Sequence, residues 1–429
     1  MNLYRRAVER ATLSGPIGVA LIGAGKFGSM FLAQVPTMPG LAIRAIADLD
    51  PARVRDRLPS LGWDQSQIGR VRFTADAVEA IGGDDVHVVV EATGDPAAGV
   101  THARAAIEAG KHVVMVNVEA DVLAGAALAA RARRAGVVYS LAYGDQPALI
   151  AELVDWARAA GFRVAAAGKG TKYLPHYHAS TPDTVWGHYG LTAEEARAAG
   201  MNSRMFNSFL DGTKSAIEMA AVANACALDV PEQGLAFPPC GADRLAEVLA
   251  PQVTGNGVVE VVSSLHRDGT PVPRDLRWGV YVVIEAPNDY AAACFRQYGL
   301  STDRSGRFAA MYRPFHLIGL ELGVSIYSAV LRGEPTGQPA SFRGDVAAVA
   351  KRDLAAGERL DGEGGYTVWG RLIPAGASLE RSTLPIGLAN DIRLTRAVAA
   401  GEILTYGDVV IDETTEAFRM RRAMERLAE

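Results

Sequence analysis

The stretch Ile17-Gly-Val-Ala-Leu-Ile-Gly-Ala-Gly-Lys-Phe-Gly28 is an apolar run followed by a glycine-rich turn and the start of an apolar helix. Its glycines Gly23, Gly25 and Gly28 have the spacing G-x-G-x-x-G. In a dinucleotide-binding βαβ unit the first glycine makes a tight turn, the second admits a pyrophosphate, and the third lets the helix pack closely on its strand. The stretch therefore predicts a nucleotide-binding turn.

Such a motif is weak evidence alone, so the surrounding chain has to meet the other conditions of the fingerprint. A helical segment over 29–35 ends at prolines, and a second apolar run ends at Asp48, 20 residues after Gly28. A carboxylate at that position binds the adenosine ribose hydroxyls and favours NAD over NADP. The alternative is an ordinary flavodoxin-like turn, which does not need three glycines and this carboxylate.

Strand and helix patterns alternate four times before residue 140, which predicts a doubly wound parallel sheet, a Rossmann domain, over residues 1–150. Ligands bind beyond the carboxyl ends of the strands in such sheets, and phosphates bind at helix N-termini. The cofactor-binding residues predicted from this topology, besides the glycines and Asp48, are Lys26, Phe27, Thr93, Gly94, Asn117 and Glu119.

Composition narrows the class of protein. With 429 residues and 49% hydrophobic content the chain can bury two or three domain cores. A net charge of −5 gives no basic footprint for nucleic acid or anionic membranes, so a small-molecule substrate is expected. No apolar stretch approaches the roughly 20 residues of a membrane span, and the three cysteines lack C-x-x-C spacing. These features predict a cytoplasmic enzyme without a disulfide framework.

The pattern changes near residue 150, which predicts a central α+β catalytic domain over 151–340. The last ninety residues contain a repeat, because 352–360 matches 396–404 at an offset of 44 residues. Each copy predicts a strand, a tight turn at a glycine and a second strand. We therefore expect a separate β-rich module over 341–429, ending in a charged helix over 413–429.

A nicotinamide enzyme needs a group that moves the alcohol proton and charges that hold the substrate. Lys169 and Lys172 follow an apolar strand, among glycines and threonine, and are expected to converge on a small anionic group. For either lysine alone, the alternative is a solvated cation.

A second candidate catalytic group is Asp211, Lys214 and Glu218. Lys214 and Glu218 lie four residues apart, which is also the spacing of a surface ion pair on a helix. The residues that follow are almost wholly apolar, so a long helix through 227 is expected to begin in a buried place. That burial favours a functional role for these charges.

Three further residue sets remain open. Arg313 and His316 precede an apolar helix and are either substrate-binding residues or contacts at the helix entry. His176 and His178 alternate as on a strand and are candidate metal ligands, but no third ligand has a diagnostic spacing. The metal therefore stays unknown.

The sequence resembles homoserine-dehydrogenase-like oxidoreductases that carry a C-terminal SAF domain. The resemblance rests on the glycine turn and on four other stretches, 115–121, 167–170, 219–224 and 313–317. The repeat after residue 342 resembles the SAF module. Relatives in this family include deoxyxylulose-phosphate reductoisomerase-like enzymes and enzymes of branched sugar acids such as apionate.

The resemblance implies a homodimer or homotetramer, action on small polyhydroxylated compounds and, in some members, a skeletal rearrangement with a divalent metal. Its matching polar positions are Asn117, Glu119, Lys169 and Arg313. The reductoisomerase-like relative uses NADPH, whereas Asp48 favours NAD and hence an oxidative reaction. We therefore expect an NAD(P)-dependent dehydrogenase or oxidoisomerase of a sugar acid, polyol or sugar phosphate. The alternatives are the reductoisomerase, a homoserine dehydrogenase and a non-catalytic nucleotide sensor.

Overall fold

The computed structural model describes residues 2–249 and 257–427, and these fold into two compact units. The first unit comprises residues up to Leu149 together with His316–Ala340 and Arg419–Leu427. The second comprises Ile150–Phe315 and Ser341–Phe418. The division at Leu149 lies within helix α8 (Gln146–Ala159). The three domains expected from the sequence, 1–150, 151–340 and 341–429, remain a prediction.

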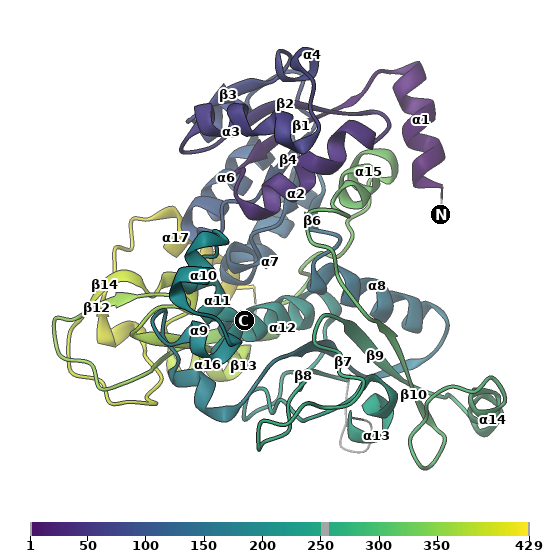
Figure 1. Ribbon diagram of the computed structural model, residues 1–429, viewed down its shortest axis with the longest axis vertical. Helices are drawn as coiled ribbons and strands as arrows, with labels where there is room; N and C mark the ends of the chain where they lie inside the picture. The colour runs from purple at the N-terminus through teal and green to yellow at the C-terminus, as the bar shows by residue number, and fades with distance from the viewer. Residues whose placement is uncertain (1, 250–256, 428–429) are drawn as a thin grey trace. The chain divides into compact units, whose positions relative to one another are not determined.

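The first unit is built on a parallel six-stranded sheet with the order β3-β2-β1-β4-β5-β6, which confirms the doubly wound Rossmann fold (Figure 1). Its strands are β1 (Ile17–Ile22), β2 (Leu41–Ala47), β3 (Arg72–Thr74), β4 (Val88–Glu91), β5 (His112–Met115) and β6 (Tyr139–Leu141). Its helices are α1 (Leu3–Leu13), α2 (Lys26–Gln34), α3 (Pro51–Arg57), α4 (Gln65–Ile68), α5 (Ala77–Ile81), α6 (Pro96–Glu108), α7 (Val118–Ala135) and α15 (Gly323–Arg332).

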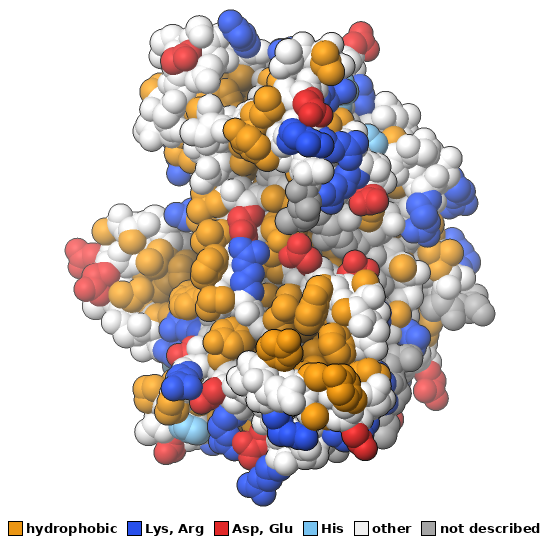
Figure 2. Space-filling view, turned by 90° about the vertical axis from the view of Figure 1, so that its right-hand side faces the viewer, with side chains coloured by type: hydrophobic (Ala, Val, Ile, Leu, Met, Phe, Trp, Pro, Cys, Tyr) orange, Lys and Arg blue, Asp and Glu red, His pale blue; other side chains and the backbone are white. Residues whose placement is uncertain are grey.

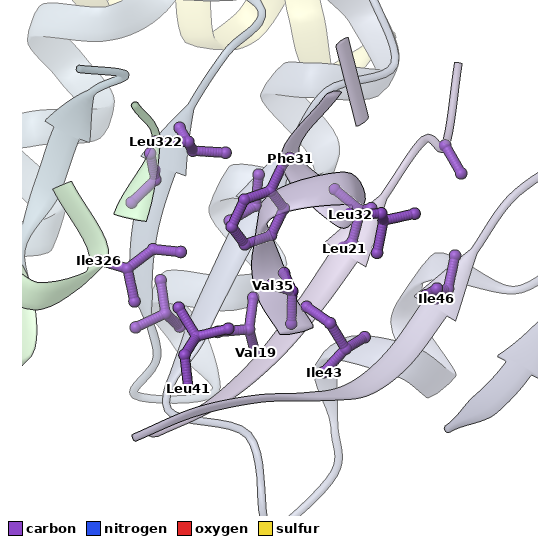
Figure 3. Close-up of a cluster of buried hydrophobic side chains, with 14 of the residues drawn as sticks. Val19, Leu21, Phe31, Leu32, Val35, Leu41, Ile43, Ile46, Leu322 and Ile326 are labelled. Atoms are coloured by element: carbon purple, nitrogen blue, oxygen red, sulfur yellow. The ribbon is translucent and has the colours of Figure 1, made fainter. Parts of the chain in front are cut away.

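The core of this unit combines residues from distant parts of the chain. Val19 of β1 and Phe31 of α2 are fully buried, and Ile326 of α15 packs in the same cluster (Figure 3). Beyond α15, the Leu141 N–H donates to the Gly337 carbonyl at 2.8 Å, and the Thr336 N–H donates to the Ser140 hydroxyl at 2.9 Å. The returning segment therefore covers the edge of β6, where unpaired backbone groups would otherwise be exposed.

One predicted strand of this unit is shorter than expected. The sequence pattern extends a strand over 111–121, but β5 ends at Met115 and α7 begins at Val118. Asn117 is the N-cap, and its side-chain oxygen accepts the Ala120 N–H at 3.0 Å. The capping bond makes a helix start more favourable here than a longer strand, so Glu119 lies in the first turn of α7.

The second unit contains a mixed four-stranded sheet with the order β10-β9-β7-β8. β7 pairs parallel with β8 and antiparallel with β9, and β10 is an antiparallel edge strand. The strands are β7 (Arg163–Thr171), β8 (Val258–Ser263), β9 (Val280–Glu285) and β10 (Phe308–Arg313). The helices around it are α9 (Val185–Tyr189), α10 (Ala193–Ala198), α11 (Ser203–Leu210), α12 (Thr213–Cys226), α13 (Leu245–Leu249) and α14 (Asp289–Gln297).

The expected long helix from residue 209 to residue 227 is two helices. α11 ends at Leu210 and α12 begins at Thr213, with Gly212 between them at φ 91°. This left-handed conformation is readily adopted only by glycine and stops a continuous helix. α12 is buried along nearly its whole length, as the apolar sequence predicted.

The C-terminal β module consists of two small sheets, β11 with β13 and β12 with β14 and β15. Its elements are β11 (Gly344–Ala350), β12 (Arg359–Asp361), β13 (Val368–Pro374), α16 (Ala375–Arg381), β14 (Asn390–Leu394) and β15 (Val409–Val410). The final helix α17 (Glu416–Glu425) begins later than expected, and residues 428–429 of the predicted helix lie outside the described range.

The internal repeat has a direct structural meaning. Leu354 in the first copy and Val398 in the second exchange backbone hydrogen bonds of 2.8 and 3.0 Å. Gly357 and Gly401 occupy equivalent turns at φ 81° and 82°. Each copy also has an arginine–glutamate ion pair at the same positions, Arg352 with Glu358 and Arg396 with Glu402. The two copies thus pair with each other. The predicted glycine turns are confirmed, whereas of the predicted strands only β12 forms, and Leu354, Val398 and Ile403 pair through isolated bridges.

Some apolar side chains remain at the surface, and Figure 2 shows hydrophobic groups gathered on one face of the molecule. On the edge strand β10, Met311 is 37% exposed and Tyr312 is 47% exposed. None of the described helices has both the length and the hydropathy to cross a lipid bilayer. The three cysteines have no disulfide partner.

A buried carboxyl group of the first unit gives a testable pH dependence. Asp121 of α7 is 1% exposed and accepts a hydrogen bond of 2.8 Å from the Tyr139 hydroxyl. Burial raises the pKa of Asp121 from 3.8 to about 7, against the opposing effect of Tyr139. Between these pH values the folded state therefore holds a proton that the unfolded state has released.

We expect Asp121 to make the protein less stable as pH rises from about 4 to about 7, with no further contribution above that range. In Asp121→Asn this part of the pH dependence disappears. Urea unfolding at several pH values checks this, with the exposed Glu108→Gln as the control. Parallel stability curves for the wild type and Asp121→Asn would contradict the assignment.

Candidate functional site

The glycine turn between β1 and α2 shows why each of its three glycines is required. Gly23 has φ 89°, and a Cβ there would lie 2.7 Å from the carbonyl oxygen of Ala92. A Cβ on Gly28 would lie 2.4 Å from the carbonyl oxygen of Gly23. At Gly25, by contrast, a Cβ would meet no atom within 4 Å. The first and third glycines therefore close the turn, and the second leaves open space beside the N-terminus of α2.

The open space has the chemistry of a diphosphate site. Gly25 is the N-cap of α2 and has no side chain to bond the first-turn N–H groups of Lys26 and Phe27. Such N–H groups and the helix dipole attract phosphate oxygens. Lys26 is exposed and carries a positive charge at the same turn. These residues therefore fit the diphosphate of a dinucleotide.

Asp48 follows β2 and lies against the glycine turn. Its Oδ2 accepts the Ala24 N–H at 2.8 Å, and its Oδ1 accepts the Asp50 N–H at 3.0 Å. The side chain is half-buried, and Asp50 places a second carboxylate nearby in sequence. The carboxylate is thus held at the end of β2, where the sequence analysis placed it.

The other predicted cofactor residues lie in the loops after β4 and β5. Thr93 and Gly94 are exposed, and Gly94 adopts φ 75° with open space around its missing Cβ. Asn117 is buried, and its amide donates to the Asp95 carbonyl at 2.8 Å, which ties the two loops together. Both hydrogen bonds of the Asn117 side chain, to the Asp95 carbonyl and from the Ala120 N–H, are structural. Glu119 is half-buried in the first turn of α7.

Sequence reasoning missed Glu91 in this region. This carboxylate is fully buried at the end of β4, and its Oε1 accepts the Thr93 hydroxyl at 2.6 Å and lies 3.2 Å from Nδ1 of His102. It holds the loop that carries Thr93 and Gly94. The available signal was an acidic residue at the end of the apolar run Val88-Val-Val-Glu91.

In the second unit, two predicted catalytic residues from different groups meet. Lys169 of β7 is 6% exposed, Glu218 of α12 is 2% exposed, and the Lys169 ammonium is paired with the Glu218 carboxylate. Glycines flank Lys169, and a Cβ on Gly168 would lie 1.8 Å from the Glu260 carbonyl oxygen. The glycine-rich strand therefore lets neighbouring backbone approach while Lys169 pairs with α12.

Asp211 does not join this pair. It is fully buried, lies 2.7 Å from the Lys351 ammonium, and accepts the Thr213 N–H at 2.9 Å. Lys351 also donates to the carbonyl oxygens of Ser180 and Gly365 at 2.8 Å. Burial raises the pKa of Asp211, and the Lys351 ammonium opposes that rise. These bonds give Asp211 a structural role between α11 and the C-terminal β module, whereas Lys214 is half-buried in the first turn of α12.

Lys172 also has its own environment, apart from Lys169. Its ammonium donates to the His188 carbonyl oxygen at 2.5 Å and lies 5.4 Å from the centre of the Tyr189 ring. Burial lowers the pKa of Lys172, and the nearby Arg277 lowers it further. The two lysines thus have different partners.

The two histidines expected on a strand lie instead on a 3-10 turn, Pro175–Ala179, because Pro175 fits the first position of a helical turn. Nδ1 of His178 lies 2.7 Å from the Asp211 carbonyl, and its Nε2 lies 2.9 Å from the Tyr173 hydroxyl. The carbonyl requires Nδ1 to carry the proton, so both ring nitrogens are engaged. Burial lowers the pKa of His178. Within residues 2–249 and 257–427, no three metal-binding side chains form a cluster.

Arg313 and His316 belong to different units. Arg313 ends β10, and its guanidinium lies 5.4 Å from the centre of the Phe315 ring. His316 begins the segment that returns to the first unit. Both are half-buried.

Two family models match adjoining parts of the chain. Residues 23–142 match the family model "Homoserine dehydrogenase, NAD binding domain", and residues 144–322 match "Oxidoreductase DRL, catalytic domain". No curated protein sequence matches the chain.

Among solved structures, a probable dehydrogenase from Thermotoga maritima is similar over 74% of this chain and 90% of its own, with 14% identity and a TM-score of 0.41. Biliverdin reductase from Synechocystis sp. PCC 6803, in complex with biliverdin and NADP+, has 19% identity and a TM-score of 0.26 over 37% of this chain. Apo scyllo-inositol dehydrogenase from Lactobacillus casei has 17% identity and a TM-score of 0.27 over 37% of this chain. The chain spans only 48% and 46% of the latter two proteins, and at these scores the likenesses carry no functional argument.

Because there is open space at Gly25, a substitution there is expected to change dinucleotide binding without changing the stability of the fold. Gly25→Ala is expected to fold normally, because its added methyl group meets no protein atom, and to weaken dinucleotide binding at least about tenfold. Thermal unfolding and a fluorescence titration with the reduced dinucleotide measure the two effects. Gly23→Ala, which forces a backbone clash, is the matched variant expected to lose stability first. Unchanged dinucleotide affinity in Gly25→Ala would contradict this site.

Proposed function

We propose that this chain, an NAD(P)-dependent oxidoreductase by its two domain matches, is an NAD-preferring dehydrogenase or oxidoisomerase of a small polyhydroxylated substrate. The substrate classes that we propose are sugar acids, polyols and sugar phosphates. The observation that carries the proposal is the buried pair of Lys169 and Glu218, an amine held beside a carboxyl group away from water.

In the proposed reaction the nicotinamide, when bound, supplies the hydride acceptor. In this reaction Lys169 acts as the neutral amine, after its ammonium has released one proton. It takes the proton of the substrate hydroxyl as the carbon is oxidised, and the Glu218 carboxylate stabilises the ammonium that forms by charge and hydrogen bonding. Because the pair is almost wholly removed from water, this electrostatic stabilisation is stronger than it would be at the surface. The residues that hold the dinucleotide are the Gly25 turn and Asp48.

We also propose a SAF-type C-terminal module and a homo-oligomeric state. The self-paired repeat supports a SAF-type assignment for the C-terminal β module, and a homodimer or homotetramer remains an expectation from the family resemblance alone.

A direct test of the function is a panel of aldonic acids, polyols and sugar phosphates incubated with NAD+ while the absorbance of reduced nicotinamide is followed. Steady turnover excludes a pure nucleotide sensor, and turnover of deoxyxylulose phosphate with NADPH alone would favour the reductoisomerase instead.

Asp48 predicts the choice of cofactor. We expect NADH to bind at least about tenfold more tightly than NADPH, because the carboxylate repels a 2′-phosphate. Asp48→Asn keeps the shape of the side chain but removes its charge, so the ratio of the two affinities is expected to move toward one. Fluorescence titration measures both affinities, and Asp50→Asn, which removes a neighbouring carboxylate, is the control. A wild-type preference for NADPH would refute this role of Asp48.

The Lys169–Glu218 pair predicts a difference between single and double variants. Lys169→Met alone leaves a buried carboxylate without its partner and is expected to cost about 3–5 kcal/mol of stability. Lys169→Met with Glu218→Leu is expected to restore stability yet to lower kcat at least about 100-fold, because the proton-transfer group is missing. Thermal unfolding and steady-state rates with the substrate found above check both effects. A stable double variant that keeps its kcat would show that the pair is only structural.

A further inference from the structure

Two cations of the second unit, Lys172 and Arg277, lie near each other without an acidic partner. Both face the same aromatic ring, since the Lys172 ammonium lies 5.4 Å and the Arg277 guanidinium 5.9 Å from the centre of the Tyr189 ring. Arg277 also stacks over Trp278, at 4.9 Å. Among the carboxylates of residues 2–249 and 257–427, none forms an ion pair with either cation, whereas Arg274, three residues from Arg277, pairs with Asp243.

The backbone explains why these two residues meet although they are far apart in sequence. A Cβ on Gly170 would lie 2.0 Å from the Leu276 carbonyl oxygen and 2.9 Å from the Arg277 nitrogen. The Gly170 N–H donates to the Gly279 carbonyl at 3.1 Å, and Asp275 accepts the Arg277 N–H at 2.8 Å. The missing side chain of Gly170 thus admits the 276–279 turn against β7, two residues before Lys172.

The side chains around Lys172 are basic or neutral, and the Asp275 carboxylate beside Arg277 accepts its backbone N–H. The His188 carbonyl oxygen accepts a hydrogen bond from Lys172, and the centres of the His176 and His188 rings lie 5.7 Å apart. Burial lowers the pKa of His188, and both His176 and Lys172 lower it further. The hydroxyl-bearing rings of Tyr177 and Tyr189 complete the cluster, and burial raises the pKa of Tyr189 to about 12, so it stays neutral. Two half-buried like charges without a counter-ion are unfavourable until an anion joins them.

We propose that Lys172 and Arg277 bind an anionic group of the substrate, a phosphate or a carboxylate. Arginine offers two parallel N–H donors that match the oxygens of either group, and lysine adds a point charge. The stacked rings hold the guanidinium in place, which lowers the entropy lost on binding. This inference rests on the proposed function in one respect, because it takes the bound anion to be part of the substrate. The substrate is then a phosphorylated or carboxylated polyol.

The test is isothermal titration of the full-length protein with inorganic phosphate and, separately, with gluconate. We expect at least one probe to bind, and Arg277→Gln and Lys172→Gln each to weaken it at least about tenfold. Arg277→Lys keeps the charge but loses the paired donors, so an intermediate loss is expected. The matched control is Arg274→Gln, three residues away, where the guanidinium is exposed and lies 3.4 Å from Asp243. Binding of phosphate assigns a phosphorylated substrate, and binding of gluconate alone assigns a carboxylated one.

Equal affinities in Arg277→Gln, Lys172→Gln and Arg274→Gln, or no binding of either probe to the wild type, would overturn the anion site. A parallel titration of each variant with NADH shows that it is folded. A turnover assay distinguishes failure of this anion site from failure of the proposed function. Anion binding that depends on Arg277, without NAD-linked turnover of any hydroxylated compound, would uphold this site and refute the proposed function.

Discussion

The burial of α12 is the constraint on which the second unit depends. Polar side chains on a helix enclosed along nearly its whole length depend on protein partners, because water cannot supply them. Glu218 therefore pairs with Lys169 of the mixed sheet, and Thr213 accepts the Gly370 N–H at 2.8 Å. Asn224 accepts the N–H groups of Arg343 and Gly344 at 2.7 and 2.9 Å. One helix thus joins the sheet to the C-terminal β module.

Close approach of backbone at glycine positions builds both candidate sites. In the first unit, Gly23 lets the turn approach the backbone of Ala92 after β4, and Gly28 lets α2 approach the turn, while Gly25 has open space around it. In the second, Gly168 and Gly170 let neighbouring backbone reach β7, on either side of Lys169 in the sequence. The absence of a Cβ therefore opens the candidate diphosphate site in one unit and brings charged side chains together in the other.

Buried charges have different roles according to how completely they are satisfied. Asp211 and Lys351 use their bonding capacity on each other and on nearby backbone groups, which is typical of a structural pair. Lys172 and Arg277 lack any such acidic partner in the described chain and therefore retain affinity for an anion. The sequence around these residues does not distinguish the two cases. Asp211 precedes an apolar segment, Lys172 follows one, and both lie near glycines.

The sequence alone determined the Rossmann sheet, the glycine turn, the place of Asp48 and the glycine turns of the repeat. Each of these depends on local spacing and backbone preference, which are readable along the chain. It did not determine that Glu218 pairs with Lys169 rather than with Lys214, or that Arg277 meets Lys172. Those pairings depend on which distant segments share a core and on where a glycine admits another backbone. Only the tertiary structure decides them, because side-chain partners across long sequence separations leave no local pattern.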